Sequence, residues 1–112
     1  MKSKGLFHRD SSKRLTLELF DIEANQYKWL CRAIVAQFDL EVASGIISNG
    51  VDVVFRDYKK GAQVVGLEWD NWSGYIIVAK NNDSEFLVRD IGGWLLEEGI
   101  CESMEGEDYF AC

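Results

Sequence analysis

Residues 64–80 read VVGLEWDNWSGYIIVAK, and this stretch decides the fold. Two runs rich in β-branched residues flank a short polar insert, a pattern that predicts two antiparallel strands joined by a tight turn. Trp69 and Trp72 lie at the predicted tip of this hairpin. We therefore expect the stretch to form the centre of an antiparallel sheet.

The segments upstream of the hairpin extend the predicted sheet. Asn49-Gly50 is a preferred pair for a two-residue hairpin turn, so one strand should end near residue 48 and another should cover 51–58. Residues 62–69 and 75–80 follow as successive strands, and short turns between them favour an antiparallel meander. Residues 40–48 fit either a short strand or the end of a helix.

One further strand and one helix are predicted near the start of the chain. Residues 14–20 alternate leucine with polar side chains, which is typical of a half-buried strand. From about 23 to 39, apolar residues fall three and four positions apart and form one helical stripe. Cys31 belongs to this stripe, which predicts a buried structural thiol. Asp21 or Asn25 would cap the first turn.

A second helix is predicted from about residue 84 to residue 98, before Gly99. Asp83 or Ser84 would cap its start. The pair Gly92-Gly93 inside it costs about 0.8–1.0 kcal/mol per glycine relative to alanine. This cost predicts a close approach of the helix to the sheet, with a break in the helix as the alternative.

The order of these elements predicts the fold class. Strand, helix, three or four strands and helix give an α+β fold, with both helices on one face of a single antiparallel sheet of about four or five strands. Residues 1–112 form one domain in this prediction. We expect residues 1–13 to be a basic flexible arm and residues 100–112 to be an acidic tail, since the ends carry opposite charge.

Composition limits the classes of partner. The formal net charge of −7 repels a phosphate backbone, which argues against nucleic-acid binding, although the basic arm leaves a local contact open. No apolar run approaches the length of about 18 residues that a membrane span needs. The polar start lacks the apolar stretch of a secretion signal. We therefore expect a cytoplasmic protein that does not bind membranes.

The sequence contains no constellation that predicts catalysis. The single histidine, His8, lies in the predicted arm, and the three cysteines lack metal-ligand spacing. Glu68, Asp70 and Asp57 could supply metal ligands on paper. We nevertheless expect no enzyme activity, no metal and no cofactor.

The predicted hairpin tip is the strongest candidate binding site. Carboxylates, an amide and two indoles there match the mixture found in ligand pockets and interface hot spots. Asp70, Asn71 and Gly74 also serve as turn residues, which is a purely structural alternative. Trp69 falls on the core-facing side of its predicted strand and should be buried, whereas Trp72 should be exposed. With Trp94 of the second helix added, the candidate site comprises Glu68, Trp69, Asp70, Asn71, Trp72 and Trp94.

The uncovered face of the sheet gives a second hypothesis. We place Val54, Tyr58, Val64, Ile76 and Val78 on it, and this set is more apolar than a wet face requires. The set predicts a homodimer or a partner contact. We therefore expect a small acidic, non-catalytic module that binds itself or a basic protein. The alternative is a protein that binds a small ligand in a cleft between the hairpin tip and the second helix.

Overall fold

The computed structural model describes residues 3–45, 47–48 and 53–106, and these form eight strands and two helices. Helices α1 (Tyr27–Phe38) and α2 (Glu85–Glu97) each follow a short 3-10 turn, η1 (Ala24–Gln26) and η2 (Asn82–Ser84). The strands are β1 (Ser3–Arg9), β2 (Leu15–Leu19), β3 (Glu41–Val42), β4 (Ile47–Ser48), β5 (Val53–Lys60), β6 (Gln63–Asp70), β7 (Gly74–Ala79) and β8 (Cys101–Gly106).

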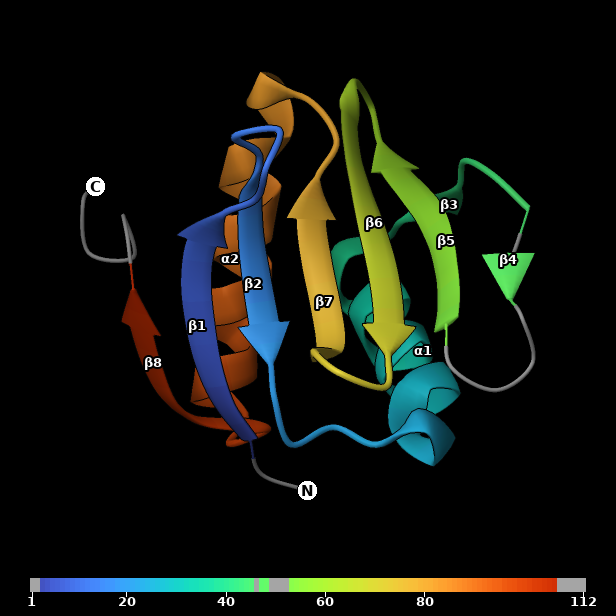
Figure 1. The fold of residues 1–112 in the computed structure, drawn as a ribbon. Helices are drawn as coiled ribbons and strands as arrows, with labels where there is room; N and C mark the ends of the chain where they lie inside the picture. Colours follow the sequence, from blue (N-terminus) through green and yellow to red (C-terminus); the bar gives the residue numbers. More distant parts are fainter. Residues whose placement is uncertain (1–2, 46, 49–52, 107–112) are drawn as a thin grey trace.

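All strands belong to one sheet, and both helices cover the same face of it (Figure 1). The strand order is β3-β5-β6-β7-β2-β1-β8, and β4 also pairs with β5. Strands β5, β6 and β7 form the antiparallel meander that the sequence predicts. Helix α1 lies behind the β5–β7 half of the sheet, and α2 lies behind β2 and β1 (Figure 1). The predicted α+β class and the placement of both helices are confirmed.

The predicted number and direction of the strands were wrong. Residues 3–9, expected to be part of a flexible arm, form β1, which is antiparallel to β2. Lys4, Leu6 and His8 alternate with the buried Ser3, Gly5 and Phe7, so the basic composition hid a strand period. The uncertain segment 40–48 contributes two short strands, β3 and β4, which both pair with β5.

The predicted acidic tail also enters the sheet, over residues 101–106. Strand β8 pairs with β1 in the parallel direction, so the sheet is mixed rather than purely antiparallel. Helix α2 returns the chain to the end of the sheet where β1 begins, and the Ser3 amide donates to the Ile100 carbonyl oxygen at 3.0 Å. From that point β8 can only run alongside β1 in the same direction. The rest of the tail, 107–112, and the Asn49-Gly50 turn lie outside the described residues.

Close packing of α2 on the sheet explains one glycine of the Gly92-Gly93 pair. A Cβ atom at Gly92 would lie 2.8 Å from Cζ of Phe7 and 3.3 Å from a methyl carbon of Leu17. A Cβ atom at Gly93 would meet nothing within 4 Å. The helix is unbroken across the pair, so the predicted close approach is confirmed at Gly92.

The helix starts differ from those predicted. Glu23, rather than Asp21 or Asn25, precedes the first turn, and its amide donates a 2.8 Å hydrogen bond to Oε1 of Gln26 in a capping box. Ser84 makes no cap hydrogen bond. Its hydroxyl accepts from the Val64 amide at 2.6 Å, which fastens the start of α2 to β6. In the described ranges, neither helix is long and apolar enough to cross a membrane.

Candidate functional site

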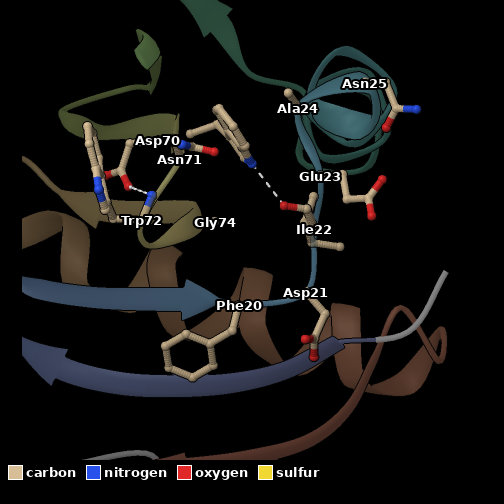
Figure 2. A pocket seen from close by; sticks show the side chains of 11 residues that line it. Phe20, Asp21, Ile22, Glu23, Ala24, Asn25, Asp70, Asn71, Trp72 and Gly74 are labelled. Atoms are coloured by element: carbon tan, nitrogen blue, oxygen red, sulfur yellow. Dashed lines mark hydrogen bonds between the residues drawn. The ribbon is translucent and has the colours of Figure 1, made fainter. Parts of the chain in front are cut away.

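A wide hollow lies at the turn between β6 and β7. Its volume is about 770 Å³, and its second wall is the loop that leads from β2 to α1 (Figure 2). Strands β2 and β7 are paired, with Leu19 opposite Tyr75, and this pairing brings the loop and the turn together. We name this hollow the acidic groove. It is lined by Phe20, Asp21, Ile22, Glu23, Ala24, Asn25, Trp69, Asp70, Asn71, Trp72 and Gly74.

Trp69 joins the two walls of the acidic groove. Its side chain is 9% exposed, in agreement with the prediction from strand parity. The indole Nε1 donates a 2.8 Å hydrogen bond to the carbonyl oxygen of Ile22, drawn as a dashed line in Figure 2. The large apolar ring therefore belongs to the core, while its one polar atom fixes the position of the loop.

The turn itself is held by Asp70. One carboxylate oxygen accepts hydrogen bonds from the amides of Trp72, at 2.9 Å, and Ser73, at 2.6 Å. Gly74 has a φ of +78°, and a Cβ atom there would lie 2.5 Å from the carbonyl oxygen of Leu19. The expected turn chemistry at these two positions is therefore present. The turn leaves the side chain of Trp72 in solvent, at 79% exposure.

Exposed aromatic rings and carboxylates occur together in this groove. Phe20, at the end of β2, is 47% exposed and adds a second ring to that of Trp72. Asp21, Glu23 and Asp70 supply carboxylates, and the lining contains no lysine, arginine or histidine. The groove thus combines flat apolar surface with net negative charge.

Two predicted site residues lie elsewhere. Trp94 packs edge-on against Phe38, with ring centroids 6.0 Å apart, and is not among the residues that line the acidic groove. A carboxylate oxygen of Glu68 lies 3.0 Å from Nζ of Lys80. The groove at the hairpin tip is thus bounded by residues 20–25 and not by the second helix.

The residues expected on the uncovered sheet face fall on both faces. Val54 pairs with the buried Trp69, and Tyr58 pairs with the buried Val65, so these two lie on the face that the helices cover. Only Val64, Ile76 and Val78 lie on the uncovered face. For β5, the predicted alternation of side chains was right, but the set assigned to the uncovered face of the sheet lies on the covered face.

Ionisable side chains form pairs on the sheet face that the helices leave open. Nζ of Lys80 lies 3.0 Å from Glu68 and 3.6 Å from Asp57, and Nε2 of His8 lies 2.7 Å from Glu18. Val78, beneath them, is only 3% exposed. The exposed large apolar side chains of the described residues are Phe20, Trp29, Val42, Trp72 and Phe86, and none lies in the middle of this face. Val64 and Ile76, on the same face, are half-buried rather than exposed.

The carboxylates considered as metal ligands do not gather. Asp57 and Glu68 share the ammonium group of Lys80, and Asp70 is engaged by the turn amides. Among the residues that the structure describes, no three histidine, cysteine or carboxylate side chains are grouped so that they could hold a metal ion.

Comparison of the chain with protein-family models, curated proteins and solved structures finds no match. What the acidic groove binds must therefore be inferred from the residues that line it. The sequence pointed to its turn wall, through Trp69, Asp70, Asn71 and Trp72. It missed the loop wall, for which the acidic run around Phe20 was the available signal.

Proposed function

We propose that this protein is a non-catalytic binding module that holds a basic segment of a partner protein in the acidic groove. The observation that carries the proposal is the exposure of Phe20 and Trp72 beside three carboxylates, in a groove lined by no basic side chain. The proposed partner segment presents arginine or lysine. We further propose that the interaction takes place in the cytoplasm.

The chemistry of the groove suits an arginine side chain. A guanidinium group can stack on the face of an indole and donate hydrogen bonds to a carboxylate at the same time. Trp72 supplies the indole, and Asp21 and Glu23 supply carboxylates on the opposite wall. Tryptophan is also among the residues that contribute most to interface energies.

The charge of the whole chain supports the same partner class. A net charge of −7 attracts a basic segment over a distance of about 10 Å at moderate salt, which raises the rate of association. Binding should therefore weaken as salt concentration rises, mainly through a slower association rate.

Calorimetric titration with an oligoarginine peptide tests this proposal. Trp72→Ala should weaken binding about fivefold or more, as expected for loss of a cation–π contact of about 1 kcal/mol. Asp21→Asn should also weaken it. Trp29→Ala is the matched control, because Trp29 lies on α1, is 51% exposed and does not line the groove.

The controls separate a specific site from general attraction between opposite charges. Glu97→Gln removes one exposed carboxylate far along the chain from the groove and should change affinity less than Asp21→Asn. An oligoglutamate peptide should not bind. Equal affinity of the Trp72→Ala and Trp29→Ala variants for oligoarginine would overturn the proposal.

A further inference from the structure

A second, smaller pocket lies between α1 and β5, and its charge is opposite to that of the acidic groove. Its volume is about 290 Å³. Three basic side chains line it, Lys28, Arg32 and Arg56, and the lining contains no carboxylate. A cluster of this kind is unexpected by composition, because acidic residues outnumber basic residues 19 to 12 in the chain.

The three cations have no acidic partner among the described residues. In the part of the chain that the structure describes, none of Lys28, Arg32 and Arg56 forms a salt bridge. Nε of Arg56 donates to the carbonyl oxygen of Ser44 at 3.0 Å. This bond positions the guanidinium group and uses only one of its five N–H donors.

The placement of the cations is unfavourable for folding alone. Lys28 and Arg32 are four residues apart on α1, so they lie on the same helix face and repel each other. Lys28 is also in the first turn of the helix, where the helix dipole favours negative charge. Arg56 lies opposite Leu67, on the face of the sheet that the helices cover. An anion in the pocket would offset both penalties and would also attract Arg56.

The remaining walls of the pocket are apolar or neutral. Tyr27, Tyr58 and Val35 offer ring and aliphatic surface, and Arg56 lies 5.9 Å from the centre of the Tyr58 ring. Cys31 Sγ forms a 3.1 Å hydrogen bond with the Tyr75 hydroxyl. Burial raises the pKa of this thiol above its ordinary value, so it adds no negative charge near neutral pH.

We propose that this pocket binds a small organic anion, with its carboxylate or phosphate group between Arg32, Arg56 and Lys28 and its planar apolar body against Tyr27 and Tyr58. The volume is near the lower end of the range of about 300–1,000 Å³ for ligand pockets, which suits a single-ring compound. Arginine is the residue best suited to carboxylate and phosphate groups because its donors match their geometry.

An NMR titration with benzoate and with phenyl phosphate tests the proposal. Each should give saturable shift changes in the amides of residues 27–35 and 56–58. Tighter binding of benzoate would identify a carboxylate ligand, and tighter binding of phenyl phosphate would identify a phosphate ligand. Benzyl alcohol, which has the ring without the charge, should bind about tenfold more weakly or not at all.

Matched variants locate the anion. Arg32→Gln and Arg56→Gln should each weaken binding about tenfold, the effect of losing one charge-assisted hydrogen bond. Lys59→Gln is the control, since Lys59 is an exposed cation on β5 that does not line the pocket. Circular dichroism of each variant shows whether it remains folded. No saturable binding of either anion, or equal loss in Lys59→Gln and Arg56→Gln, would overturn the proposal.

This pocket is independent of the acidic groove. Trp72→Ala, which tests the groove, should leave benzoate binding unchanged, because Trp72 does not line the pocket. Arg56→Gln should likewise leave oligoarginine binding unchanged or slightly stronger. The two proposals therefore fail separately.

Discussion

The indole Nε1 of Trp69 lies 2.8 Å from the carbonyl oxygen of Ile22, to which it donates a hydrogen bond. This bond links β6 to the loop between β2 and α1, two segments 47 residues apart in the chain. It is made by a side chain that also fills the core beneath the acidic groove. Stability and the shape of the groove are therefore coupled through one residue.

Replacement of Trp69 by phenylalanine tests this coupling. Trp69→Phe keeps an aromatic ring but leaves the Ile22 carbonyl without its partner and reduces the buried volume. We expect the free energy of unfolding to fall by about 1–3 kcal/mol, measured by urea denaturation. Trp72→Phe is the control and should change stability by less than about 0.5 kcal/mol, because that ring is largely exposed. Equal effects of the two substitutions would contradict this account.

The adjacent glycines of α2 should respond to alanine with opposite signs. Gly92→Ala places a methyl group 2.8 Å from the Phe7 ring and should destabilise the protein by about 1–3 kcal/mol through overpacking. Gly93→Ala meets open space and should stabilise it by up to about 1 kcal/mol, the gain in helix propensity. Thermal unfolding of both variants measures the difference. A lower melting temperature for Gly93→Ala than for Gly92→Ala would show that the packing of α2 is not as described.

Local periodicity was sufficient to predict the meander and both helices. Residues 53–79 alternate in the way that paired strands require, and the helices carry apolar residues at spacings of three and four. The cost of glycine in a helix also predicted the close approach that occurs at Gly92. These features depend on neighbours in the sequence, so the sequence reveals them.

Features that depend on distant pairing were missed. The pairing of β1 with both β2 and β8 makes strands of two highly charged ends. The second wall of the acidic groove exists only because β2 lies beside β7. The faces of β5 were reversed for a similar reason, since alternation gives two sets of residues but does not say which set the helices cover.

Stability should decline in alkaline solution. Burial is the main cause that raises the pKa of Cys31 above its ordinary value of 9.0 and the pKa of Tyr75 above 10.0. A raised pKa in the folded state means that folding favours the protonated group. The contribution of these groups to the free energy of unfolding is therefore fully present below about pH 9 and is lost as pH rises further. The free energy of unfolding falls by about 1.4 kcal/mol per pH unit for each group that is ionised in the unfolded state but protonated in the folded state.

Urea denaturation under reducing conditions at pH 7.5, 9 and 10 measures this decline. Cys31→Ala should reduce the decline between pH 9 and 10 without abolishing it, because burial also raises the pKa of Cys101. Stability that rises across this interval would show that neither thiol is buried as described.

The ion pairs on the uncovered sheet face should be energetically coupled through Lys80. Its ammonium group lies between Glu68 and Asp57, and all three side chains are less than one third exposed. Lys80→Ala leaves two carboxylates facing each other and should destabilise the protein by about 1 kcal/mol. In the double variant with Glu68→Ala, the loss should be smaller than the sum of the single losses by about 0.5–1 kcal/mol.

Lys59→Ala is the matched control for this cycle, since Lys59 is exposed and its substitution should add independently to that of Glu68. High salt should reduce the Lys80–Glu68 coupling by screening, but only in part because both groups are partly buried. Strict additivity of Lys80→Ala and Glu68→Ala at low salt would mean that the charged cover of this face does not act as a unit. In that case Val78 would depend for its burial on aliphatic parts of the same side chains alone.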